Sequence, residues 1–373
     1  MSFIQKELRV LGIMSGTSLD GVDYVWTRVV REGASSLSIS YDRQRSARFP
    51  SALRTQLAKA AAHQLKVDEL AELHFALGKF YAAALVKIMK DSPMSFDLIG
   101  LHGQTVYHRG GVATLQIGEP SFLSHEFSVP VVNNFRPADI VAGGQGAPLA
   151  PYFHQVAFGK AGTMVAVHNL GGISNLTLLQ GHQFLMGYDT GPANMPMDVF
   201  VQKKSKEKKK YDQDGKMARR GKVDEDLLLK ALKHPYFRKT APKSCGREEF
   251  GIDWVRKVFA KNPRITLEDG LATLTEIVAT SIAREYLEMG AEMPSEIIFC
   301  GGGSRNIFLL ERIKSHLPQI QIFTSEQKGW PSQSIEGAAF ALLAAARVWD
   351  IRIDHKHTTG ALKPVALGQI TAL

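Results

Sequence analysis

Five polar or glycine-rich turns follow strand-like runs of the sequence and hold most of the residues that could do chemistry. In α/β proteins, ligands gather where loops leave the carboxyl ends of strands, so turns of this kind are able to converge on one cleft. The five turns are residues 15–21 (SGTSLDG), 102–105 (HGQT), 169–175 (NLGGISN), 189–194 (DTGPAN) and 301–304 (GGGS).

The first and third turns have the composition of phosphate-binding loops. Their glycines let backbone N–H groups approach phosphate oxygens closely, and Ser15, Thr17 and Ser18 add hydroxyl donors. Asp20 could hold a hydrated Mg²⁺. Any β-hairpin also needs such a turn, so one turn alone indicates little. Two of them in matching positions of a duplicated chain favour a triphosphate that is bound from two domains.

Residues 301–304 follow the apolar run 297–300. The glycines of this turn permit close backbone approach to a flat ligand such as an adenine base. A tight strand-to-helix turn has the same composition, so both interpretations stay open on spacing alone.

Asp189 ends a strand-like segment and is followed by Thr-Gly-Pro, with Pro192 placed to begin a helix. An aspartate at this position is either the N-cap of that helix or a general base aimed into the cleft. Phosphoryl transfer needs little more than such a base, a metal ion and good positioning.

Composition and missing motifs exclude several classes of protein. Hydrophobic residues make up 45% and charged residues 22%, which fits a folded globular protein and argues against a disordered, collagen-like or coiled-coil chain. The sequence holds no P-loop, no complete GxGxxG, no HExxH and no GxSxG. It has neither an apolar run that could span a membrane nor an export signal, and Cys245 and Cys300 form no ligand or disulfide pattern. We therefore expect a cytoplasmic protein with no membrane partner.

The net charge of +9 comes mostly from one segment. Residues 203–222 hold ten Lys or Arg against three acidic residues, a balance of +7, which leaves +2 for the rest of the chain. Nucleic-acid binding through this segment would normally come with interleaved aromatic residues, and only Tyr211 is near. We expect a solvated face and no nucleic-acid partner.

Strand-like and helix-like stretches alternate along the whole chain, which indicates an α/β fold. Strands are expected over 9–14 and 22–30 and again over 163–168 and 176–179, each pair joined by a glycine turn, so the architecture looks duplicated. Amphipathic helices are expected over 68–90 and from 267 to a stop at Gly290, and a buried helix over 336–349. A domain boundary is expected within residues 133–150, where Gly, Pro and small residues cluster.

Eleven segments of the sequence resemble, in order and approximate spacing, the anhydro-N-acetylmuramic acid kinase family over residues 10 to about 365. The resemblance implies two actin-like (RNase H-like) α/β domains, as in hexokinase and Hsp70, flanking an interdomain nucleotide cleft. The first domain would hold residues 1–134 and about 350–373, and the second 135–349. The matching segments are GIMSGTSLDGVD, GLHGQTVYH, LQIGEP, FRPADIVAGGQGAPL, NLGGISNLT, GYDTGPANMPMD, YDQDGKMARRGKV, PKSCGREEFG, ATLTE, CGGGSRN and IEGAAFALLA.

The family phosphorylates O6 of 1,6-anhydro-N-acetylmuramic acid with ATP and Mg²⁺ while water opens the anhydro bridge, in the recycling of murein. By this resemblance Asp189 is the catalytic base. The sugar would be contacted by Gln104, Thr105, Arg136 and Glu336. The ATP-binding residues would be Ser15, Gly16, Thr17, Ser18, Asp20, Asp23, Asn169, Gly171, Gly172, Asn175, Gly301, Gly302 and Gly303.

Three features leave alternatives open. Asn134 and Ala193 replace residues that are common in the family, and Lys203 to Lys210 is unusually basic. A levoglucosan-type kinase has a similar pattern, and an actin-like ATP-binding module without enzyme activity is a different class. Lys243, Ser244 and Arg247 match a family loop without an assigned role, and the family often forms homodimers.

Overall fold

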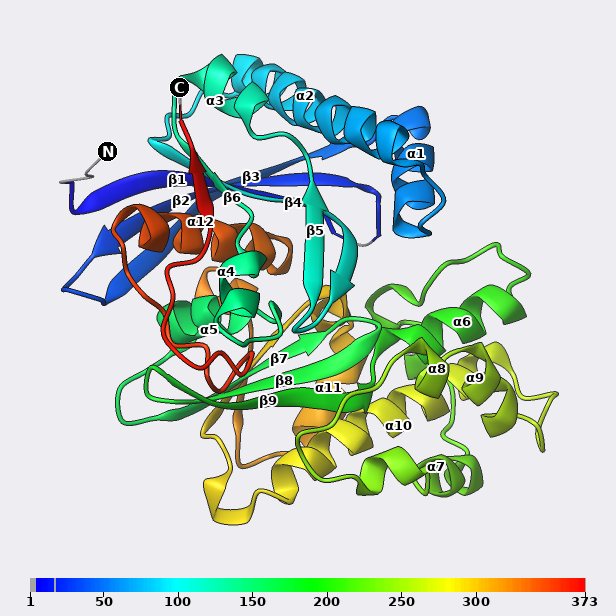
Figure 1. Ribbon diagram of the computed structural model, residues 1–373. Helices are drawn as coiled ribbons and strands as arrows, with labels where there is room; N and C mark the ends of the chain where they lie inside the picture. Colours follow the sequence, from blue (N-terminus) through cyan, green and yellow to red (C-terminus); the bar gives the residue numbers. More distant parts are fainter. Residues whose placement is uncertain (1–4, 17, 373) are drawn as a thin grey trace. The chain divides into compact units, whose positions relative to one another are not determined.

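The computed structural model describes residues 5–16 and 18–372, and its contacts divide the chain into two compact units (Figure 1). The first unit holds residues 1–157 and 333–373, and the second holds residues 158–332. These boundaries differ from the expected ones at 134/135 and about 349/350. The segments before residue 158 and after residue 332 pack with the first sheet, so the second unit is shorter at both ends than the sequence predicted.

The first unit is built on a seven-stranded sheet. Its strand order is β12-β6-β4-β1-β2-β3, with β5 paired to β4. The strands β1, β2 and β3 form an antiparallel meander, whereas β4 is parallel to β1 and β6 is parallel to β4. The bounds are β1 Glu7–Met14, β2 Gly21–Arg31, β3 Leu37–Arg48, β4 Leu98–Arg109, β5 Ala113–Ile117, β6 Val131–Asn133 and β12 Gln369–Thr371.

Helices cover both faces of this sheet (Figure 1). Side chains alternate across a strand, so Leu11 and Ile13 of β1 pack with α1 and α2, while Gly12 faces α12. The long helices α2 and α12 confirm the expected helices over 68–90 and 336–349. The bounds are α1 Ser51–Ala61, α2 Val67–Asp91, α3 Ser121–Phe127, α4 Arg136–Val141, α5 Ala150–Phe158 and α12 Ile335–Val348.

Two glycines set how closely α12 lies on β1. A Cβ on Gly12 would lie 1.9 Å from the carbonyl oxygen of Gly337, and a Cβ on Gly337 would lie 2.5 Å from a methyl of Val25. Neither position has room for a side chain. The first turn of α12, which carries Glu336, is therefore fixed against the strand that leads into the first glycine turn.

The second unit repeats the sheet of the first. Its five strands have the order β11-β10-β7-β8-β9, with β7, β8 and β9 antiparallel and with β10 and β11 parallel to β7. This is the order and direction of β6-β4-β1-β2-β3, which confirms the duplicated, actin-like architecture. The bounds are β7 Met164–Leu170, β8 Ile173–Gln180, β9 Gln183–Pro192, β10 Glu296–Cys300 and β11 Gln321–Thr324.

The helices of the second unit share one large apolar core with its sheet. The longest helix, α10, begins at the N-cap Thr266, whose side chain accepts a hydrogen bond from the N–H of Asp269, as the sequence predicted. Most of α10 is buried. The bounds are α6 Asn194–Lys204, α7 Glu225–Ala231, α8 Arg247–Phe250, α9 Ile252–Val258, α10 Leu267–Leu287 and α11 Ile307–His316. Among residues 5–16 and 18–372, no helix is long and apolar enough to span a membrane.

Candidate active site

The β1–β2 turn of the first unit holds most of the expected first phosphate loop. Gly16 is open, because a Cβ there would meet no described atom within 4 Å. The side chains of Ser18 and Asp20 are exposed, while Thr17 lies outside the described residues. Ser15 differs from the expectation of a free hydroxyl donor, because its buried Oγ lies 2.8 Å from the Tyr81 hydroxyl and 3.2 Å from the Gly103 carbonyl oxygen. Only its backbone is left for a ligand.

Asp23 lies just after this turn, on β2. Its Oδ1 accepts hydrogen bonds from Ser46 at 2.5 Å and from Gln44 at 3.1 Å, both on the neighbouring strand β3. The carboxylate is therefore held by the sheet, and its charge contributes to raising the pKa of Glu336.

The second expected turn, residues 102–105, is not a turn, because it lies inside β4, which continues to Arg109. The parallel pairing of β1 with β4 places Met14 opposite Gly103. His102 of β4 is buried, and burial together with the nearby Arg136 lowers its pKa to about 3, so the imidazole is neutral. Its Nδ1 lies 2.8 Å from the Gly103 carbonyl oxygen, which can only accept, so Nδ1 carries the proton. The free Nε2 then accepts from Arg136 Nη2 at 3.0 Å.

Two of the four expected sugar contacts carry a buried polar atom without a partner. Among the described residues, Gln104 Oε1 and Arg136 Nε have neither a hydrogen bond nor contact with solvent. Such atoms are costly unless something pairs with them. Arg136 is otherwise fixed, since Nη1 donates to the Gly146 carbonyl oxygen at 2.9 Å. Thr105 Oγ1 accepts from Gln116 at 3.2 Å.

Glu336 stands in the first turn of α12, and solvent reaches it. Its pKa is raised by partial desolvation and by the charge of Asp23, while Arg136 opposes the shift. Two expected sugar contacts, Arg136 of α4 and Glu336 of α12, are therefore electrostatically coupled within one unit.

In the second unit, the parallel strands β7 and β10 bring the third and fifth turns side by side, with Cys300 opposite Asn169. Gly301 has a φ of +80°, and a Cβ there would lie 2.3 Å from Asn169 Oδ1. Gly302 is exposed. Gly303 also has no room for a side chain, because a Cβ would lie 2.7 Å from Leu170. The turn between β7 and β8 is shorter than expected and consists of Gly171 and Gly172.

The structure rejects a helix cap as the role of Asp189. The residue lies inside β9, and the next helix, α6, begins at Asn194 with Ala193 as its N-cap. Pro192 closes the strand and does not start the helix.

The Asp189 carboxylate is held by side chains and backbone of its own unit. Oδ1 accepts from Asn175 Nδ2 at 3.0 Å, and Oδ2 accepts from Ser244 Oγ at 2.9 Å and from the Cys245 N–H at 3.0 Å. One of the two amide N–H groups of Asn175, which was expected to bind ATP, donates to Asp189.

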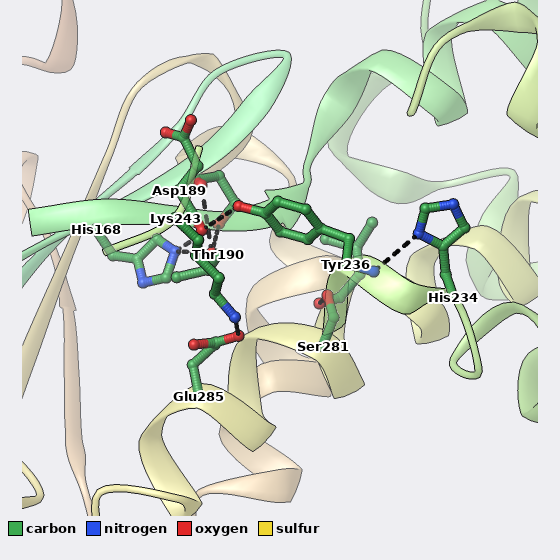
Figure 2. Close-up of polar contacts among 10 residues, drawn as sticks. His168, Asp189, Thr190, His234, Tyr236, Lys243, Ser281 and Glu285 are labelled. Carbon is green, nitrogen blue, oxygen red and sulfur yellow. Dashed lines mark hydrogen bonds and ion pairs between the residues drawn. The ribbon is translucent and has the colours of Figure 1, made fainter. Parts of the chain in front are cut away.

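Contacts of Lys243 and Tyr236 hold the loop that contains Ser244 and Cys245 (Figure 2). Lys243 forms a buried ion pair with Glu285 of α10. The Tyr236 hydroxyl donates to the backbone carbonyl of Asp189 at 2.6 Å. Burial raises the pKa of Glu285, and Lys243 opposes the shift.

A buried polar network lies under the same strand. His168 Nδ1 lies 2.6 Å from the Tyr286 hydroxyl, and its Nε2 lies 2.5 Å from Ser174 Oγ. Thr190, next to Asp189, donates to Ser174 Oγ at 2.8 Å. Burial lowers the pKa of His168 to about 3, so the ring is neutral and links α10, β7, β8 and β9 without a charge.

The chain was compared with known proteins. The model of the family described as "Anhydro-N-acetylmuramic acid kinase" matches residues 8–372. The chain belongs to this family. Curated relatives of that name are 39% identical in Idiomarina loihiensis, over 96% of this chain and 98% of the relative, and 34% identical in Caldanaerobacter subterraneus, over 98% of each. A third, in Sulfurimonas denitrificans, is 37% identical over 96% and 98%.

Among solved structures, component A of the (R)-2-hydroxyglutaryl-CoA dehydratase of Acidaminococcus fermentans is 10% identical. The match has a TM-score of 0.44 and covers 92% of this chain and 99% of that one. A likeness this distant adds nothing to the family assignment.

Membership of the anhydro-N-acetylmuramic acid kinase family makes the chain a kinase, an ATP-using phosphotransferase. Sequence reasoning missed Tyr236 and Glu285 and gave no role to Lys243 and Ser244, and these four residues hold the loop or the Asp189 carboxylate. They lie 47 to 96 positions away in the chain, so no local spacing connects them to Asp189. The segment PKSCG gave the only signal, as a family match without a role.

The described residues fit a magnesium ion that is held mainly by phosphates. Within 5–16 and 18–372, no group of three or more His, Cys, Asp or Glu is arranged for a metal. Mg²⁺ usually keeps several waters and takes one or two carboxylates together with nucleotide phosphates, which requires no such cluster. The exposed Asp20 carboxylate suits that arrangement.

Several basic side chains of residues 203–222 make local contacts. Lys204 donates to the Ile265 carbonyl oxygen at 2.6 Å, Arg219 pairs with Glu311, and Arg220 pairs with Glu268. Lys216 pairs with Asp214. These ion pairs are solvent-exposed and screened, which agrees with the expected solvated face.

Proposed function

We propose that this chain transfers the γ-phosphoryl group of ATP to O6 of 1,6-anhydro-N-acetylmuramic acid while water opens the anhydro bridge. The products are N-acetylmuramic acid 6-phosphate and ADP, and the reaction belongs to murein recycling. Family membership over nearly the whole chain supports the substrate. The observation that carries the chemistry is the Asp189 carboxylate, which is partly exposed and fixed by three donors.

The reaction balances with one base. A water oxygen attacks C1, the bond between C1 and the bridge oxygen breaks, and that oxygen becomes O6 and attacks the γ-phosphorus. The bond from the γ-phosphorus to the β-phosphate oxygen then breaks and releases ADP. The bridge oxygen has no proton to give, so the only proton to remove comes from water, and Asp189 takes it.

The hydrogen bonds on Asp189 indicate which oxygen is the base. A carboxylate offers about four lone-pair sites. Oδ2 already accepts two hydrogen bonds, whereas Oδ1 accepts one, from Asn175. We therefore assign Oδ1 as the atom that binds the attacking water and accepts its proton.

The two glycine turns bind the phosphates of ATP in this proposal. Gly16 and Gly171 have space for an approaching ligand, since a Cβ would meet nothing closer than 3.4 Å at either position. The Gly171 N–H already donates to the Ile173 carbonyl oxygen at 3.1 Å. We therefore assign the backbone N–H groups of Gly16 and Gly172, with the exposed Ser18, as donors to phosphate oxygens. Mg²⁺ bound near Asp20 would neutralise charge on the phosphates. The exposed Gly302, which follows Gly301 in the turn after β10, is assigned to the adenosine.

The sugar is assigned to polar residues in the middle of β4 and in the first turns of α4 and α12. Gln104 Oε1 and Arg136 Nε are buried and unpaired within the described part of the chain, and hydroxyl, amide and carboxylate groups of a sugar would pair them. Thr105 and Glu336 complete this set. Because ATP is made and used in the cytoplasm, we infer that the enzyme acts there; a homodimer stays an expectation from the family.

Mass spectrometry of the products tests the proposed function. The protein is incubated with ATP, Mg²⁺ and anhydro-N-acetylmuramic acid, and in a parallel reaction with levoglucosan. A phosphorylated, ring-opened N-acetylmuramic acid with one ADP per sugar is expected. Turnover of levoglucosan alone would support the levoglucosan-type alternative, and no phosphosugar from either would contradict the proposal.

A further inference from the structure

We propose that Ser244 is a positioning residue for Asp189 and that the buried Lys243–Glu285 ion pair anchors the loop that presents it. The loop in question is residues 242–246 (PKSCG), here named the clamp loop. This inference rests on the proposed function, because it takes Asp189 as the base.

Three consecutive residues of the clamp loop, Lys243, Ser244 and Cys245, form hydrogen bonds with Asp189. The N–H of Asp189 donates to the Lys243 carbonyl oxygen at 3.0 Å. Ser244 Oγ and the Cys245 N–H then both donate to Oδ2. The loop thus holds the backbone of the base and one side of its carboxylate.

The side chain of Lys243 turns the other way, into the core of the unit (Figure 2). It is 3% exposed and its partner Glu285 is 8% exposed. The ammonium also lies 5.4 Å from the ring centre of Tyr236 and 5.8 Å from that of Tyr188. Removing one partner of such a pair leaves an uncompensated buried charge, so the pair fixes the loop strongly on α10.

Tyr236 contacts both Lys243 and Asp189. Its ring packs against the Lys243 ammonium, and its hydroxyl donates to the Asp189 carbonyl oxygen. Asp189 and the clamp loop are therefore held by the same group of contacting residues, Lys243, Tyr236 and Glu285.

The consequence is a fixed direction for Oδ1. With Oδ2 held by two donors, rotation of the carboxylate about its last torsion is restricted, and Oδ1 keeps its free lone pair in one place. Without the Ser244 hydroxyl, one of the two donors on Oδ2 is lost. A misaligned base slows the chemical step and leaves substrate binding unchanged.

Ser244→Ala and Ser244→Thr test the positioning role. We expect Ser244→Ala to lower the single-turnover rate about tenfold, with KM for ATP and for the sugar within about twofold of wild type, because one hydrogen bond to a charged group is lost. Ser244→Thr keeps the hydroxyl and should recover most of the rate. The control is Ser315→Ala, which removes a hydroxyl that donates to Arg312 O on α11.

The anchor is tested with a pair of variants. Lys243→Met leaves Glu285 unpaired in the core and should destabilise the protein. The double variant Lys243→Met with Glu285→Gln removes both charges, so it should fold, yet its single-turnover rate should stay about tenfold below wild type. A folded double variant with the wild-type rate would overturn the anchoring role.

Failure of the inference can be told from failure of the proposed function. If wild type makes the phosphosugar and Ser244→Ala makes it as fast, Ser244 does not position the base. The same holds if Ser244→Ala raises KM and leaves the rate unchanged. If wild type makes no phosphosugar, the proposed function is wrong, and the role of Ser244 is wrong with it.

Discussion

The carboxylate of Asp189 receives two hydrogen bonds on Oδ2 and one on Oδ1. The sequence predicted the residue but left two roles open, because an aspartate before Thr-Gly-Pro suits a helix cap as well as a base. The cap is excluded by β9, which continues to Pro192. For Ser15 the residue type suggested a hydrogen-bond donor to a ligand, but the structure shows its hydroxyl in contact with Tyr81 and Gly103. Residue type alone does not reveal such partners, which lie 14 to 88 positions away.

Asp189→Asn tests the base directly. The amide keeps an acceptor oxygen and the shape of the side chain, but it cannot take a proton from water, so turnover should fall on the order of 10²-fold or more. ATP affinity and the unfolding temperature should change little. Phosphosugar formation at the wild-type rate by a folded Asp189→Asn protein would remove Asp189 from the mechanism.

Gly16→Val tests the first phosphate loop. No described atom would touch the new Cβ, so the fold should be kept, while the branched side chain would block the approach of phosphate oxygens to the backbone. Calorimetry should show ATP affinity weakened by about tenfold or more, with sugar affinity unchanged. The ATP affinity of Gly16→Ala should lie between those of wild type and Gly16→Val. An unchanged ATP affinity would make this turn a hairpin only.

At the scale of helices and strands, local sequence signals predicted most elements. The glycine hairpins, α2 and α10 follow from apolar periodicity and from the Thr266 cap. The placement of α12 could not be predicted in this way. It joins the first unit because Gly12 and Gly337, 325 positions apart, allow strand and helix to touch. A contact of that kind leaves no periodic signal.

Gly12→Ala tests this contact. Its Cβ would lie 1.9 Å from the Gly337 carbonyl oxygen, and backbone cannot yield as a flexible side chain can. Overpacking of this kind costs about 1 to 3 kcal/mol, measured by urea unfolding. Gly16→Ala, on the same hairpin but in open space, is the matched control. Equal stability of the two variants would show that α12 does not lie so closely on β1.

The buried network at His168 predicts a pH dependence of stability. The pKa of His168 falls from the ordinary 6.5 to about 3 in the folded protein because burial excludes the charged form. A depressed folded pKa stabilises the protein above pH 6.5, and this contribution is lost as the pH falls from 6.5 toward 3. Between pH 7.5 and pH 5 the linkage amounts to about 2 kcal/mol.

His168→Gln keeps a hydrogen-bonding side chain but does not titrate. When the pH falls from 7.5 to 5, the free energy of unfolding of His168→Gln should therefore decrease by about 2 kcal/mol less than that of wild type. Both proteins are unfolded in urea at each pH, so other titrating groups cancel in the difference. Parallel pH profiles would mean that His168 is protonated without penalty in the fold.

At the scale of the whole molecule, the two sheets repeat one strand order, and each has a glycine turn at the carboxyl end of its first strand, β1 or β7. The sequence predicted this duplication from the two hairpins and the family from eleven ordered segments. Family membership makes the chain a kinase. We further propose that opening of the anhydro bridge by water and transfer of the phosphoryl group occur together in one active site.

Isotope labelling of water tests this coupling most directly. The reaction is run with ATP and anhydro-N-acetylmuramic acid in ¹⁸O-water, and the products are analysed by mass spectrometry at early times. N-acetylmuramic acid 6-phosphate kept in the same water serves as the control for spontaneous exchange at C1. We predict one ¹⁸O in the sugar, on C1, and none in the phosphoryl group. A phosphosugar with its anhydro ring intact and no ¹⁸O, or ¹⁸O in released inorganic phosphate alone, would contradict the coupling.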